Sequence, residues 1–78
     1  MRKYCLEFIL NMQAVSPETL RNSIVEFGED LEVFPLPQDN DAKARDFRIR
    51  IYTEDPAIIF DTCAQLGRLK SVKIDEKH

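Results

Sequence analysis

Four segments of the chain alternate between apolar and polar residues with a period of two, which is the pattern of β-strands with one buried face. They span residues 4–10, 31–34, 47–52 and 71–75. Between the first and second segments, and again between the third and fourth, apolar residues recur at the spacing of an amphipathic helix. The apolar helical positions are Leu20, Ile24, Phe27, Ile59, Cys63 and Leu66. The pattern therefore predicts the element order β-α-β-β-α-β.

The two predicted helices begin and end with the same kinds of residue. In Ser16-Pro17 and Asp55-Pro56, a side-chain oxygen that can accept from a free backbone N–H precedes a proline at the first helical position. Gly28 and Gly67 follow at equal intervals, and we expect Gly28 to end its helix in a left-handed conformation. The shared start and end residues indicate two copies of one strand-helix-strand unit.

This order predicts an α+β protein with a ferredoxin-like βαββαβ sandwich fold. Right-handed crossovers place both helices on one face of a four-stranded antiparallel sheet whose first and third strands are central. The 78 residues are too few for a second hydrophobic core, so we expect a single domain over residues 1–78. The polar stretch at about 36–46, with Asp39, Asn40 and Asp41 in a row, predicts a mobile loop.

The alternation assigns side chains to two chemically different faces of this sheet. One face should pack on the helices, and its residues are Tyr4, Leu6, Phe8, Val33, Phe47, Ile49, Ile51, Val72 and Ile74. The opposite face, which we call the open face, should carry Cys5, Glu7, Ile9, Glu32, Phe34, Arg48, Arg50, Tyr52, Lys73 and Asp75. Apolar and charged residues therefore mix on a surface that no helix is expected to cover.

We interpret the open face as a protein-contact surface carried by Ile9, Phe34, Arg48, Arg50 and Tyr52. An apolar patch with a charged rim is the usual composition of such a contact. Cys5 and Glu7 are expected to support it, because Glu7 lies on the strand next to the two arginines. The residues alone leave two alternatives open, a solvated charged face and a small-ligand site.

Composition narrows the function classes. The formal net charge is −3, so the chain has no broad electrostatic attraction for nucleic acid, and the aromatic-rich basic motif of RNA-binding sheets is missing. A single histidine and the lack of a phosphate-binding loop argue against an independent enzyme and against a cofactor or metal. The two cysteines fit reduced thiols, and no apolar run reaches the roughly 20 residues of a membrane span, so we expect a cytoplasmic protein.

Four stretches are similar to successive parts of one known domain. The opening, Tyr4 to Leu10, matches the pattern Tyr-Cys-x-Glu-Phe-x-Leu, and Leu20 to Val33 follows that domain's helix, glycine and short strand. Arg48 to Pro56 resembles its strand leading into a threonine and a proline, and Leu66 to Ile74 resembles its Gly-x-Leu-x-x-Val-Lys-Ile ending. On these residues the chain resembles the middle domain of fatty acid kinase A and related dihydroxyacetone-kinase-like proteins.

The resemblance implies a domain that helps to assemble a kinase without carrying its nucleotide site. In that family ATP lies on a separate N-terminal domain and a DegV-type partner protein presents the fatty acid. The chain by itself is therefore expected to lack kinase activity. The expected partner is a protein, either a second copy of the chain or a kinase or DegV-type partner, and a small-molecule ligand is left open.

Two positions depart from the family pattern. The resemblance implies a metal site formed by a first-strand cysteine, here Cys5, and two third-strand histidines, whose positions are Arg50 and Tyr52. Because a guanidinium is always charged and cannot ligate zinc, we expect that metal site to be lost. The alternative function is a small-ligand-binding regulatory domain of the ACT type, which shares the element order and would bind near the turn from Asn11 to Ser16.

Overall fold

A computed structural model describes residues 3–13, 16–37 and 44–77, and residues 1–2, 14–15, 38–43 and 78 lie outside the described part. The described part contains four strands, two α-helices and one short 3-10 helix. In chain order they are β1 (Lys3–Gln13), α1 (Pro17–Ile24), η1 (Val25–Phe27), β2 (Glu29–Pro35), β3 (Ala44–Thr53), α2 (Pro56–Leu66) and β4 (Gly67–Lys77).

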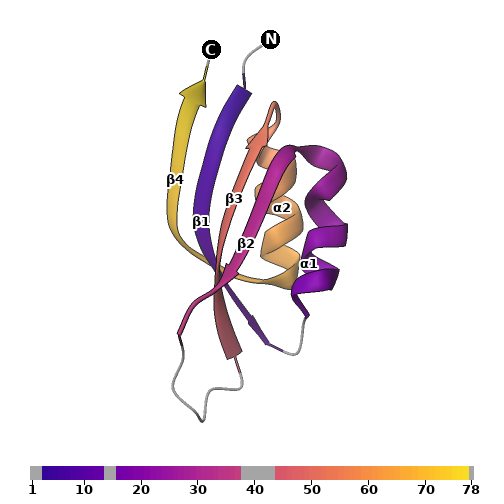
Figure 1. Ribbon diagram of the computed structural model, residues 1–78, viewed down its shortest axis with the longest axis vertical. Helices are drawn as coiled ribbons and strands as arrows, with labels where there is room; N and C mark the ends of the chain where they lie inside the picture. The colour runs from indigo at the N-terminus through magenta and orange to yellow at the C-terminus, as the bar shows by residue number, and fades with distance from the viewer. Residues whose placement is uncertain (1–2, 14–15, 38–43, 78) are drawn as a thin grey trace.

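The strands form one open antiparallel sheet in the order β2-β3-β1-β4 (Figure 1). β1 and β3 are the central strands, as predicted, and they pair from Tyr4 opposite Thr53 to Gln13 opposite Ala44. β2 and β4 form the two edges. An α+β protein with a four-stranded antiparallel sheet and two helices is therefore confirmed.

Both helices begin as the sequence predicts. The Ser16 hydroxyl oxygen accepts from the backbone N–H of Thr19 at 3.2 Å, and the Asp55 carboxylate accepts from that of Ile58 at 3.4 Å. A proline follows each cap, where its missing N–H costs no helical hydrogen bond. Each helix start is thus determined by residues adjacent in sequence.

The prediction for Gly28 is wrong in its conformation. α1 ends at Ile24 and continues as η1, and Gly28 has an extended backbone with φ −166° rather than a left-handed one. Glycine is required there for space, because a Cβ would lie 2.5 Å from the carbonyl oxygen of Tyr52 and 2.7 Å from the side chain of Ile51. The first helical segment therefore runs into β2 along the surface of β3.

The strands are longer than the alternation predicts. β1 continues through Met12, which is buried, so the predicted connector after Leu10 is partly strand. β3 already begins at Ala44, which shortens the predicted loop at 36–46, whose residues 38–43 lie outside the described part. β4 begins directly at Gly67, opposite Met12. These extensions follow from backbone pairing between β1 and both of its neighbours, which needs no apolar alternation.

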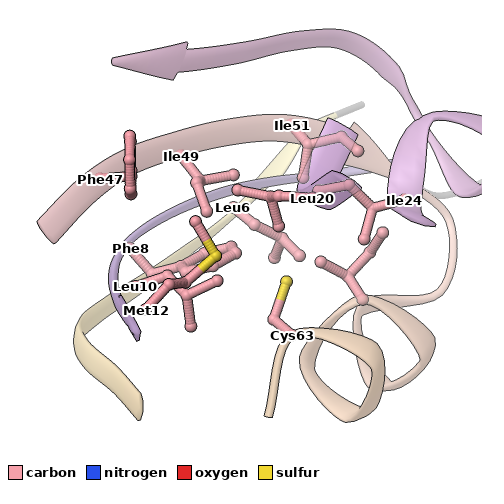
Figure 2. Packing of buried hydrophobic residues seen from close by; sticks show 11 residues of the cluster. Leu6, Phe8, Leu10, Met12, Leu20, Ile24, Phe47, Ile49, Ile51 and Cys63 are labelled. Atoms are coloured by element: carbon pink, nitrogen blue, oxygen red, sulfur yellow. The ribbon is translucent and has the colours of Figure 1, made fainter. Parts of the chain in front are cut away.

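The core lies between one face of the sheet and both helices. Its buried residues are Leu6, Phe8, Leu10, Met12, Leu20, Ile24, Phe47, Ile49, Ile51, Ile59 and Cys63 (Figure 2). Even-numbered residues of β1 stand opposite odd-numbered residues of β3, so both sets project toward the helices. The rings of Phe8 and Phe60 meet edge to face with their centroids 5.5 Å apart.

Two β4 residues are less covered than predicted. Ile74 stands opposite Leu6 and therefore lies on the helix side of the sheet, as does Val72 two residues earlier. Their side chains are nevertheless 49% and 48% exposed. The helices pack over β1 and β3, while β4 lies at the sheet edge beyond them (Figure 1). The expectation that both residues pack beneath the helices is wrong for this reason.

Candidate functional site

The strand register brings all five predicted contact residues together on the open face. Between β1 and β3, Ile9 stands opposite Arg48, while Arg50 and Tyr52 follow at alternate positions of β3. Phe34 of β2 stands on the other side of Arg48. None of these side chains contributes to the core cluster, which occupies the opposite face. Their grouping on one surface agrees with the sequence analysis.

A row of charged residues with alternating sign crosses the open face. Arg50 of β3 lies between Glu32 of β2 and Glu7 of β1, and Glu7 in turn lies opposite Lys73 of β4. Opposite charges on neighbouring strands contribute about 0.2–1 kcal/mol per pair. The supporting role predicted for Glu7 has this placement as its structural basis, since Glu7 stands between two cations.

A second row, adjacent to the first, is more apolar. It places Phe34, Arg48, Ile9 and Lys70 side by side across β2, β3, β1 and β4. The Phe34 side chain is 50% exposed, and Ile9 is half-buried. The open face therefore combines an exposed aromatic ring, an aliphatic side chain and two cations within one row.

Polar residues that the sequence analysis did not single out border this row. Asn11 donates from Nδ2 to Oδ1 of Asp46 at 2.7 Å, and the Lys70 ammonium lies 3.6 Å from the same oxygen. Asn11 and Asp46 stand opposite each other on β1 and β3. No sequence pattern identifies this group, because its members come from three strands that only the register brings together.

Cys5 is covered on the open face by a side chain rather than by a helix. The Arg50 guanidinium donates to the Tyr52 hydroxyl at 3.2 Å and lies 5.8 Å from the centroid of its ring. Hydrogen bonding to Cys5 first, and to Tyr52 second, holds the pKa of Arg50 above its usual value. Cys5 is consequently only 7% exposed, although it points away from both helices. Arg50 therefore connects residues of β1 and β3.

The same three residues occupy the positions where the resemblance implies a metal site. Cys5 stands opposite Tyr52 and diagonal to Arg50, so the positions are adjacent, but two of the three side chains cannot ligate zinc in the way that histidine does. Among the described residues, no three His, Cys, Asp or Glu side chains are placed to hold a metal ion.

An open pocket of about 310 Å³ lies at one end of the molecule, between η1, β2 and the start of α2. Lys3 reaches Glu29 at 2.6 Å on its border, and this hydrogen bond is the main cause that raises the pKa of Lys3. One wall is held by Thr53, whose hydroxyl donates to the Phe27 carbonyl at 2.6 Å and accepts from the Asp55 N–H at 3.1 Å. The sequence analysis missed this pocket, because its walls come from segments far apart in the chain.

Comparison with known proteins agrees with the resemblance found in the sequence. The family model of the FakA-like middle domain, which is the middle domain of proteins like fatty acid kinase A, matches residues 1–77. No curated protein matches the chain. The match gives no support to the ligand-binding alternative of the ACT type. Within the described ranges, no helix is long and apolar enough to cross a membrane.

Proposed function

Because the chain belongs to the family of fatty acid kinase A-like middle domains, we propose that it is a non-catalytic assembly domain that binds another protein through its open face. The partner is a second copy of the chain or a kinase or DegV-type protein, in the cytoplasm. We assign the fold to the ferredoxin-like type, which the central position of β1 and β3 supports. The observation that carries the proposal is the uncovered row of Phe34, Arg48 and Ile9.

The composition of this row suits a protein interface better than a solvated surface. Aromatic residues and arginine are enriched at protein contacts, whereas lysine and acidic residues dominate ordinary surfaces. Phe34 exposes half of its side chain next to Arg48, and Tyr52 presents its ring under the Arg50 guanidinium. A partner that covers Phe34 and Ile9 would remove apolar surface from water, which favours association.

Arg50 is placed to give such a contact its geometry. Its guanidinium is already held by Tyr52 and Cys5, so little further side-chain freedom is lost when a partner binds. Glu7 and Glu32 flank Arg50, so a partner must match an alternating charge row rather than one sign of charge. The apolar row supplies affinity, and the charged row supplies orientation.

The test is a double substitution on the open face, Arg50→Glu with Tyr52→Ala. We expect it to weaken self-association or capture of the kinase or DegV-type partner at least tenfold, because it reverses one charge and removes one aromatic contact. Sedimentation velocity and pull-down with the purified partner measure the loss. Arg21→Glu, an equal charge change on the exposed side of α1, is the matched control and should leave binding intact.

Folding must be checked in the same samples, because Arg50 also covers Cys5. Phe34→Ala provides a second variant, since its ring is half exposed and lies outside the core. If both open-face variants unfold at the wild-type temperature and still bind as the wild type does, the open face is not the contact and the proposal fails.

A further inference from the structure

The two edges of the sheet differ in how well they can accept another strand. β2 ends in Pro35, which has no N–H to donate, and its register shifts between Glu29 and Glu32, where Asp30 has φ 52°. Its ionisable side chains are all acidic, at Glu29, Asp30 and Glu32. A second β2 would therefore meet a short edge of like charge.

β4 offers a longer regular edge. Its register shifts only near Ser71, which has φ 51°, and residues 73–77 beyond this bulge pair regularly with β1. Here Val72 and Ile74 are half exposed on the helix side, and the cation Lys73 and the anion Asp75 lie on the open face. Within the described residues, β4 has a neighbouring strand on one side only (Figure 1).

We propose that two copies of this chain pair antiparallel along β4 beyond its bulge, which joins their sheets into one of eight strands. Alignment about a two-fold axis at Ile74 places Ile74 opposite its own copy. The same alignment places Lys73 opposite Asp75 of the second copy, and Asp75 opposite its Lys73. Facing residues stay on the same side of the sheet, as antiparallel pairing requires.

The charges of the existing sheet agree with this register. Lys73 lies next to Glu7, which lies next to Arg50, so the open face has alternating signs up to β4. Asp75 of the second copy continues this alternation beyond Lys73. A shift of the axis to Lys73 would place Lys73 opposite its own copy, which is unfavourable. Complementary charge and the half-exposed Ile74 thus select a second copy of this chain as the occupant of the edge.

The test reverses the two charges separately and then together. Lys73→Asp and Asp75→Lys each create two like-charge pairs in a dimer, so each should raise the dimer dissociation constant by roughly tenfold. The double variant Lys73→Asp with Asp75→Lys restores opposite pairs and should recover the wild-type value. An equimolar mixture of the two single variants should form a mixed dimer, because each provides what the other lacks.

Sedimentation equilibrium from micromolar to millimolar concentration measures these constants. Arg21→Asp and Asp61→Lys, exposed helix positions with the same charge changes, are matched controls and should leave the dimer unchanged. Lys73→Asp also faces Glu7 within its own chain, so circular dichroism must show that each variant is folded. Recovery in the mixture cannot come from unfolded chains, which keeps the test valid if one variant is less stable.

Three results would overturn the proposal: a wild-type chain that stays monomeric at millimolar concentration, a dimer that both single variants leave unchanged, or a mixture that does not associate better than its components. Assembly into higher oligomers would point instead to pairing of unlike edges and would also overturn it. If Arg50→Glu with Tyr52→Ala abolishes the dimer and the β4 reversals do not, association runs through the open face. The edge proposal can therefore fail while the proposed function stands, and the reverse also holds.

Discussion

At Gly67 the chain passes from α2 into β4 directly beside the backbone of β1. The residue has an extended conformation with φ −178°, which any amino acid adopts, so backbone freedom does not explain the glycine. A Cβ at this position would collide with the carbonyl oxygen of Asn11 and would also touch the side chain of Met12. The close approach of two strands is what requires glycine here.

Gly67→Ala should therefore destabilise the protein, although alanine is the better helix-end and strand residue by propensity. Forcing one extra carbon against a paired backbone costs about 1–3 kcal/mol. Chemical denaturation measures the change in unfolding free energy. Gln65→Ala, an exposed position two residues earlier, should change it by less than about 0.5 kcal/mol. An alanine at 67 that leaves stability unchanged would contradict the close approach.

Cys63 shows how burial controls a thiol. Its side chain is fully buried on α2, and this burial raises the pKa of the Cys63 thiol to about 11. In the unfolded chain the thiol ionises near about pH 8.5. The folded state therefore keeps a proton that the unfolded state loses, so this residue's contribution to stability is present below about pH 8.5 and falls as the pH rises toward 11.

We expect the unfolding free energy of the wild-type protein to fall more steeply between these two pH values than that of Cys63→Ala. For one group the difference in slope is at most about 1.4 kcal/mol per pH unit. Denaturation curves at several pH values measure both slopes, and comparing them removes the titration of tyrosine and lysine. Parallel slopes would show that the thiol ionises equally easily in the folded and unfolded chain.

At the scale of the elements, the helix starts are local and the strand ends are not. The caps at Ser16 and Asp55 use residues within three positions of each other. Each edge strand instead contains one non-glycine residue with positive φ, Asp30 in β2 and Ser71 in β4, next to a shift of register. Such bulges depend on how a strand meets its neighbour, which no single segment specifies.

Ser16→Ala and Asp55→Ala should each lower the unfolding free energy by about 1 kcal/mol, because each leaves a backbone N–H of the first helical turn without its acceptor. Asp55→Asn keeps an acceptor oxygen and should retain most of the stability. Thermal or chemical denaturation compares the three variants with the wild-type protein. If Asp55→Ala and Asp55→Asn are equally stable, the hydrogen bond to Ile58 does not contribute.

At the scale of the whole molecule, two helices are too few to cover four long strands. They pack over the central strands, which leaves one entire face of the sheet and the helix side of β4 without a covering layer. The open face and the β4 edge meet at Lys73 and Asp75, so the two proposed contacts adjoin each other without sharing their principal residues. An assembly domain can thus use one sheet to make two kinds of contact.

The sequence by itself determined the strands, the helices, the caps and the residues on each face of the sheet. These depend on periodicity and on neighbours a few positions away, and for the same reason the grouping of Arg48, Arg50 and Tyr52 could be predicted. Only the tertiary structure decided that Cys5 is buried beneath Arg50, that Met12 joins the core and that Ile74 stays half exposed. Burial is set by whichever element comes to lie over a residue, and that element can be distant in the chain.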